Sequence, residues 1–192
     1  MKRNYVTTAS LILFASSAGA ALAQQQQHDE AAQSSSVKSV LTTPSSMKVE
    51  HAHLHHELTE ALASGGKTAE AAKKVEAVLM PHFAEEEAYA MPPLSLLETV
   101  ARGRQPTEAQ ASEAIRMTDK LRANYDRMIA EHGEVTAALR QLAAAAREEK
   151  KPRQAEFAEA LILHAQNEEQ ILYPAALVLG DYLKLKAASS HP

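Results

Sequence analysis

One pattern occurs twice in this chain, and it restricts the fold more than any other feature. The stretches "PHFAEEEAYAMPPL" and "LHAQNEEQILYPAA" each contain a histidine, glutamates four and five residues after it, and a proline ten residues after it. On a helix, residues four apart lie on the same face, so His82 lies beside Glu86 and His164 beside Glu168. The pattern predicts two similar helices, each with a histidine and a carboxylate on one face.

A second correspondence links two other segments of the chain. His51 in "EHAHLHHEL" and His132 in "EHGEVTAAL" are 81 positions apart, and a glutamate precedes each. His82 and His164 are 82 positions apart, which is nearly the same offset. The sequence therefore consists of two similar halves, each of which supplies two histidines and a glutamate.

Almost the whole sequence beyond residue 43 is helical in character, because alanine, leucine, glutamate, lysine and arginine dominate it. The third helix begins at a capping box in which Thr107 is the cap and Gln110 lies three residues on, and we expect it to bend near Gly133. Prolines ten residues after the motif histidines bend or stop the second and fourth helices. The expected helices are 44–64, 68–92, 107–147 and 152–186. Two helix pairs joined by a longer connection predict an all-α protein, an up-down four-helix bundle.

Each expected helix carries one histidine in the middle of its apolar face. On the first helix Leu54 and Leu58 share the face of His51, and on the third Val135 and Leu139 share that of His132. A single buried histidine is more often a hydrogen-bonded core residue. Two ionised carboxylates in an apolar interior, however, repel each other and are strongly disfavoured without a cation. The combination predicts a metal site in the bundle core, where imidazole and carboxylate suit first-row transition metals.

The first residues have the pattern of a targeting signal. Lys2 and Arg3 precede the apolar run "ASLILFASSAGAALA", and Ala21, Leu22 and Ala23 form a small-x-small cleavage site. We expect residues 1–23 to be a secretory signal peptide, 24–43 a polar, disordered leader, and 44–188 a single domain. The protein is therefore expected in the periplasm or secreted, and free of the membrane once the signal is cleaved.

Charge and cysteine content exclude several classes of partner and of stabilisation. The chain contains no cysteine and has a formal net charge of −4. An exported protein without disulfides depends on packing or on a metal for its stability. The acidic balance argues against nucleic acid as a partner and gives no sign of a basic, membrane-binding face.

These motifs together resemble the hemerythrin-like, or HHE cation-binding, domain family over about residues 44–186. The shared signature is Glu-His on the first and third helices and His-x-x-x-Glu-Glu, followed by proline, on the second and fourth. The resemblance implies a four-helix bundle with two iron ions, bridged by carboxylates and a solvent oxygen, that bind dioxygen or related small molecules. The ligands that it implies are His51, His82, Glu86, His132, His164 and Glu168.

Two departures from the oxygen carriers of that family concern the ligand set. The carriers have a fifth histidine on the third helix, where this chain has Thr136, whereas His55 follows His51 by one turn. We expect His55 to lie on the inner face and to complete a five-histidine set in the other half. The carriers also use a carboxylate at +5 on the last helix, but Glu169 points about 140° away from His164, so Glu168 at +4 is the expected ligand.

The resemblance favours an exported non-haem di-iron protein that binds dioxygen, nitric oxide or peroxide, for binding, sensing or scavenging. A different possibility is a di-iron oxidoreductase in oxidative or nitrosative stress defence. It would need a redox partner protein, and Tyr89 and Tyr125 are its candidate redox side chains. The motifs are also compatible with a metal store or buffer, with zinc, manganese or copper in place of iron. A metal-free helical interaction protein would leave Glu86 and Glu168 without explanation.

Overall fold

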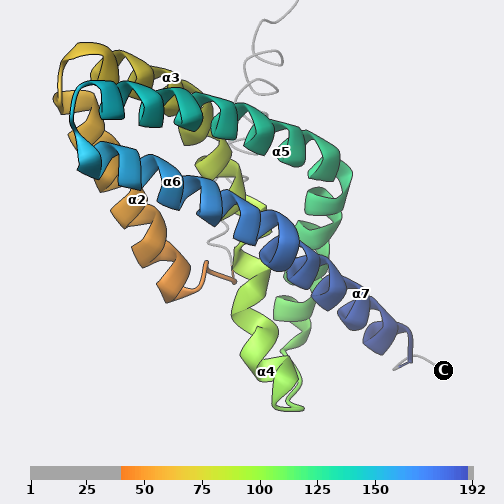
Figure 1. Ribbon diagram of the computed structural model, residues 1–192. Coiled ribbons are helices and arrows are strands. Elements are labelled where there is room, and N and C mark those ends of the chain that lie inside the picture. Colours follow the sequence, from red (N-terminus) through yellow and green to blue (C-terminus); the bar gives the residue numbers. More distant parts are fainter. Residues whose placement is uncertain (1–39, 190–192) are drawn as a thin grey trace, which may run out of the picture. The chain divides into compact units, whose positions relative to one another are not determined.

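The computed structural model describes residues 40–189, and all of their regular elements are helical (Figure 1). The expected signal peptide, 1–23, and residues 24–39 of the expected leader lie outside the described residues. The α-helices are α2 (Ser45–Ala63), α3 (Gly66–Glu85), α4 (Leu97–Ala101), α5 (Glu108–Glu148), α6 (Pro152–Asn167) and α7 (Tyr173–Ser189). Three short elements differ in their hydrogen bonding: the π-helical turns η1 (Glu86–Ala90) and η3 (Glu168–Leu172), and the 3-10 helix η2 (Pro92–Leu96).

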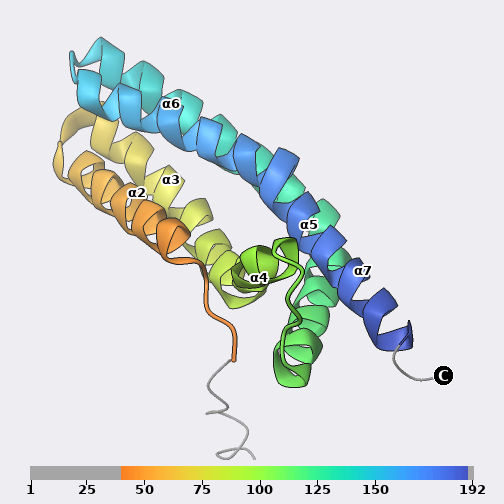
Figure 2. The same ribbon diagram turned by 90° about the horizontal axis from the view of Figure 1, so that it is seen from below.

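Helices α2, α3, α5 and α6 form the expected four-helix bundle. Each of them contacts two of the others, in the order α2, α3, α5, α6 and back to α2 (Figure 2). Short turns join α2 to α3 and α5 to α6, while η1, η2 and α4 make the longer connection between the two pairs. Within residues 40–189, no helix combines the length and the apolar character needed to cross a membrane.

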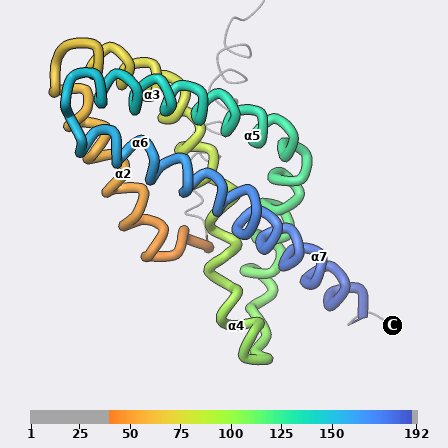
Figure 3. Tube along the Cα trace, in the orientation of Figure 1, coloured from red at the N-terminus to blue at the C-terminus, as the bar shows by residue number. Residues whose placement is uncertain are grey.

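The prolines of the two motifs have different consequences. After η1, the chain enters η2 at Pro92 and turns away, whereas Pro174 lies inside α7 and the helix continues to Ser189. Figure 3 shows α6, η3 and α7 following one another as a single rod. Helix α5 is unbroken through Gly133 and curves along its course (Figure 1). The capping box of Thr107 and Gln110 is confirmed, since both of its hydrogen bonds are present.

Two apolar clusters form the core. One lies between α2, α3, α5 and α6 and includes Leu58, Val75 and Leu139. The other lies between η1, η2, the first half of α5 and α7, and Met91 and Leu121 belong to it. Leu41 also packs in this second cluster, so buried packing begins ahead of residue 44, the expected start of the domain. Between the two clusters the buried residues are histidines and glutamates.

A carboxylate from a distant turn caps the start of α3. Glu149, in the turn between α5 and α6, accepts hydrogen bonds from the backbone nitrogens of Lys67 (2.7 Å) and Thr68 (3.1 Å). Lys151 and these groups hold the pKa of the Glu149 carboxyl at about 2. Gly66 has a φ of 66°, which favours glycine, and a Cβ there would lie 2.2 Å from this carboxylate and displace it. The cap joins the two helix pairs at one end of the bundle.

Two glycines within helices, one in α5 and one in α7, provide a test of how α7 packs against α5. A Cβ on the buried Gly180 of α7 would lie 2.1 Å from Oγ1 of Thr118 on α5, whereas one on the exposed Gly133 meets nothing within 4 Å. We expect Gly180→Ala to lower the free energy of unfolding by about 1–3 kcal/mol through overpacking. Gly133→Ala, the matched control, raises it by up to about 1 kcal/mol because alanine is the better helix former. Urea titration followed by circular dichroism measures both, and equal shifts for the two variants would contradict the predicted α5–α7 contact.

Candidate metal centre

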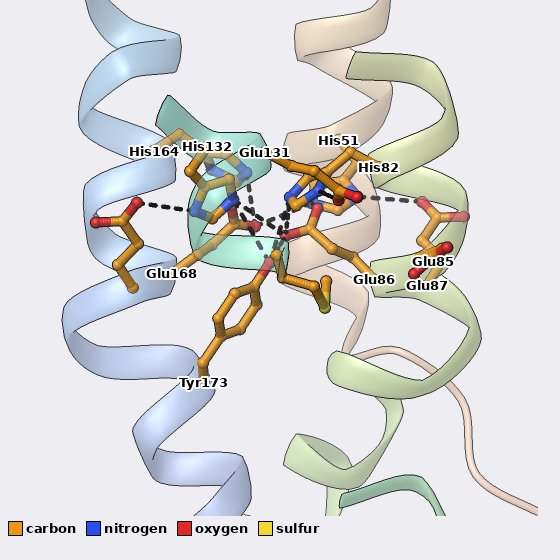
Figure 4. A network of polar contacts seen from close by, with 12 residues as sticks. His51, His82, Glu85, Glu86, Glu87, Glu131, His132, His164, Glu168 and Tyr173 are labelled. Atoms are coloured by element: carbon orange, nitrogen blue, oxygen red, sulfur yellow. Dashed lines mark hydrogen bonds and ion pairs between the residues drawn. The ribbon is translucent and has the colours of Figure 1, made fainter. Parts of the chain in front are cut away.

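Six of the seven predicted site residues meet in the layer between the two apolar clusters. They come from all four bundle helices and the two π-helical turns, and they point toward one another (Figure 4). Their exposed fractions are 3% for His51, 2% for His82, 0% for Glu86, 1% for His132, 5% for His164 and 1% for Glu168. An ionised carboxylate buried to this degree requires a compensating positive charge.

The six side chains form two groups of potential metal ligands. One group is His51, His164 and Glu168, and the other is His82, Glu86 and His132. In the first group, Oε1 of Glu168 lies 3.0 Å from Nε2 of His164 and 3.6 Å from Nε2 of His51. The second group repeats these distances, because Oε1 of Glu86 lies 3.2 Å from Nε2 of His82 and 3.7 Å from Nε2 of His132.

Each glutamate also reaches the other group with its second oxygen. Oε2 of Glu168 lies 3.4 Å from Nε2 of His132, and Oε2 of Glu86 lies 4.0 Å from Nε2 of His51. The two carboxylates therefore lie between the groups, each with one oxygen on either side. This arrangement suits two cations that share both carboxylates.

Four buried atoms at the centre have no hydrogen-bond partner among the described residues. They are Nε2 of His51, Nε2 of His164, Oε1 of Glu168 and Oε2 of Glu86. Buried polar atoms without partners are rare in folded proteins because their desolvation is not offset. Imidazole nitrogens and carboxylate oxygens that face one another without sharing a hydrogen bond fit a metal ion placed among them.

The outer nitrogen of each histidine contacts a glutamate nearer to the surface. The Nδ1 atom lies 3.2 Å from Glu87 in His51 and 2.8 Å from Glu131 in His82. The same holds for His132 with Glu169 at 3.2 Å and for His164 with Glu50 at 3.0 Å. A carboxylate only accepts, so Nδ1 donates and Nε2 carries the lone pair that faces the centre. These glutamates are 30 to 52% exposed.

The glutamates also control the protonation of the histidines. Burial lowers the pKa of His132, but the neighbouring carboxylates of Glu168 and Glu86 outweigh burial and raise it to about 10. The same balance, with Glu168 and Glu50, raises the pKa of His164 to about 9. Burial raises the pKa of Glu168, yet the imidazoles of His132, His164 and His51 beside it hold it well below its ordinary value. Without a cation, the buried negative charge is therefore balanced by protons on histidine.

A tyrosine that the sequence reasoning did not select also reaches the centre. The hydroxyl of Tyr173 donates a hydrogen bond to Oε1 of Glu86, and its oxygen lies 3.3 Å from Nε2 of His82 and 3.5 Å from Nε2 of His132. Burial, then the charges of Glu86 and Glu168, raise the pKa of Tyr173 far above its ordinary value. Its position directly before the motif proline was the available signal.

The π-helical turn η3 explains why Tyr173 was missed. It is five residues after Glu168, and on a regular α-helix that spacing would place it about 140° away. Because the backbone nitrogen of Tyr173 bonds to the carbonyl oxygen of Glu168, five residues back, the turn is wider and Tyr173 returns to the inner face. The two tyrosines named above as candidate redox side chains have other partners. The Tyr89 hydroxyl binds Glu85 and lies 3.3 Å from Sδ of Met128, and Tyr125 contacts the ring of Tyr173.

The expectation that His55 lies on the inner face is wrong. His55 is exposed and belongs to neither ligand group. The buried residues of α2 centre about 40° to one side of His51, and His55 lies about 40° to the other side. It lines a surface cleft of about 290 Å³ together with His51, Phe83 and Glu87. The choice of Glu168 over Glu169 agrees with the geometry, since Glu169 contacts the outer nitrogen of His132 instead.

The comparisons with known proteins identify one family. The sequence model of the hemerythrin HHE cation-binding domain matches residues 42–176, a segment that contains all six residues of the centre. No curated protein and no solved structure matches the chain.

The outer glutamates provide a direct test of the centre. We expect Glu131→Gln to weaken metal binding about 10–100-fold, because the glutamine no longer stabilises the ligand tautomer of His82 by charge. Competition with a coloured chelator measures the affinity. Glu134→Gln, an exposed position on the same helix, serves as the control and should bind as the wild type does. Equal affinities for the two variants would show that the Glu131 contact has no part in metal binding.

The raised pKa values of His132 and His164 predict how metal stabilisation varies with pH. In the metal-free protein their protonated forms contribute stability that is complete below pH 6.5, and this stability is lost as the pH rises through about 9 and 10. A metal needs neutral imidazole, so its binding strengthens over the same interval. We expect the difference in Tm between metal-loaded and chelator-treated protein to increase from pH 6.5 to 9.5. A difference that shrinks over this range would contradict the assignment of these histidines as ligands.

Proposed function

Because the chain belongs to the hemerythrin HHE cation-binding domain family, we propose that it is an exported non-haem protein that holds two iron ions and binds a small ligand. The ligand is dioxygen, nitric oxide or peroxide, and the activity is binding, sensing or scavenging. The observation that carries the proposal is the pair of buried ligand groups that share the two carboxylates of Glu86 and Glu168. The donor set of imidazole and carboxylate suits iron, and the burial suits a ligand without charge or of small size.

The side chains around the centre orient the predicted ligands and exclude water from the layer in which they lie. When bound, two iron ions would supply reversible binding of, or electron exchange with, the small ligand. The histidines are held in place by the outer glutamates, and the ring of Phe83 stacks on His51 with ring centroids 4.3 Å apart. On the other side, the Tyr173 hydroxyl holds a proton beside Glu86. Apolar clusters above and below the layer exclude bulk water from it.

A surface cleft on each side of the bundle brings small molecules close to the centre. The cleft of about 290 Å³ is lined by His51 and Glu87, and a cleft of about 320 Å³ by His132 and Glu169. The two clefts occupy corresponding positions in the two halves of the chain. Each cleft is lined by one predicted ligand together with its outer glutamate.

Metal content and optical spectra test the proposal. The chain from Gln24 onward, purified and reduced, should contain about two irons and develop an oxygen-dependent absorption band that reverses on deoxygenation. His51→Ala should lose iron and the band. His56→Ala, an exposed histidine on the same helix, should retain both. Zinc alone, or an iron-loaded protein that binds no diatomic ligand, would count against ligand binding and favour a metal store.

The position of Tyr173 favours a second candidate, a di-iron oxidoreductase. A phenol beside the ligand groups can exchange an electron and a proton with bound iron, and a chain without cysteine would obtain its electrons from a redox partner protein. Sustained consumption of peroxide or nitric oxide with an added reductant, lost in His82→Ala, would support this candidate. A single turnover per protein would leave ligand binding as the function.

Export is part of the proposal and is supported by the sequence pattern of residues 1–23. Expression of the 192-residue sequence in a Gram-negative host should yield a periplasmic protein whose first residue is Gln24. Mass spectrometry of the periplasmic fraction measures this. Recovery of the uncleaved chain from the cytoplasm would contradict export.

A further inference from the structure

The two ligand groups correspond closely, but their surroundings differ at two pairs of positions. Where the second half has Tyr173, the first half has Met91, and each follows its motif glutamate by five residues. Where the first half has Phe83, the second half has Ala165. All four are buried beside the layer. The two halves of the chain therefore match in their predicted ligands but differ in the side chains that pack beside those ligands.

The Tyr173 oxygen occupies the position of a further ligand in one group only. Metal–nitrogen and metal–oxygen bonds of about 2.0–2.2 Å place neighbouring donor atoms roughly 2.9–3.4 Å apart. The Tyr173 oxygen lies 3.3 Å from Nε2 of His82 and 3.5 Å from Nε2 of His132, close to this range. Nε2 of His82 and Oε1 of Glu86 are 3.2 Å apart. The Tyr173 oxygen therefore lies beside all three potential ligand atoms of this group.

The unpartnered atoms lie on the other side of the centre. The Nε2 atoms of His51 and His164 and Oε1 of Glu168 have no hydrogen-bond partner among the described residues, and neither has Oε2 of Glu86, which faces them. In the group of His82 and His132, the Tyr173 hydroxyl is the partner instead. Figure 4 shows the phenol entering from below, between the two carboxylates, with its oxygen directed at this group.

We propose that Tyr173 is an oxygen ligand of the metal ion held by His82, Glu86 and His132, so that the two ions are inequivalent. Coordination replaces the hydroxyl proton, which passes to solvent, and frees Oε1 of Glu86 from its hydrogen bond so that it binds the same ion. Both nitrogens, both facing carboxylate oxygens and the phenolate then make five protein donors at this ion. The ion of His51 and His164 has four, so we expect an external ligand to bind that ion.

The inference rests on the proposed function in one respect, the use of iron as the probe. The purified protein, loaded with ferric iron, should show a visible phenolate-to-iron charge-transfer band. Tyr173→Phe should lose the band while it keeps the same metal content. Tyr125→Phe removes the neighbouring phenol, whose ring centroid is 6.3 Å from that of Tyr173, and should retain the band. Survival of the band in Tyr173→Phe would overturn the assignment, as would its absence from iron-loaded wild type.

A second measurement needs no variant and separates this inference from the di-iron proposal. Resonance Raman excitation within the band of the wild-type protein should enhance tyrosinate ring vibrations, and their absence would also overturn the assignment. If the protein takes up no iron, the di-iron proposal fails. The same band and vibrations are then sought with copper(II), whose phenolate complexes also absorb visible light, and their presence or absence decides the role of Tyr173.

Discussion

The burial of two carboxylates is the constraint on which the rest of this structure depends. Glu86 and Glu168 are 0 and 1% exposed, in the middle of a helical core, and ionised groups in such a place are strongly disfavoured alone. Four histidines surround them, one from each helix of the bundle. Protons on histidine or metal ions can supply the compensating charge, and the unpartnered atoms between the groups favour metal ions.

The outer glutamates, nearer to the surface, contact the four histidines, and these contacts link the helices to one another. Each outer glutamate contacts a histidine on a different helix: Glu50 of α2 reaches His164 of α6, and Glu131 of α5 reaches His82 of α3. The Glu-His dipeptides thus serve two purposes, since one residue faces the centre and its neighbour supports a ligand elsewhere. Assembly of the bundle and assembly of the centre therefore require the same contacts, which couples metal binding to folding.

The two halves of the chain share the same predicted ligands, yet the surroundings of the two ion positions differ. The six inner side chains and four outer glutamates follow the repeat, and corresponding distances are similar, the largest difference being 4.0 Å for His51–Glu86 against 3.4 Å for His132–Glu168. Tyr173 and Phe83 do not follow it, and each borders only one of the ligand groups. A protein with two equivalent ligand groups gains two different chemical environments in this way, without change to the ligands themselves.

The sequence by itself determined the helical class, the pairing of the helices, the capping box at Thr107 and the six inner side chains. These features follow from local spacing, because residues one turn apart share a face and because a carboxylate on an apolar face demands a partner. Only the tertiary structure decided which side chains lie at the margins of those faces. His55 lies outside because α2 packs with its buried face turned to the far side of His51. Tyr173 lies inside because the π-helical turn after Glu168 rotates the following residues relative to a regular α-helix. A search for residues spaced at the regular α-helical period does not detect this rotation. The partners of the histidines, like the cap that Glu149 places on α3, join residues far apart in the chain, and such contacts exist only once the helices have packed.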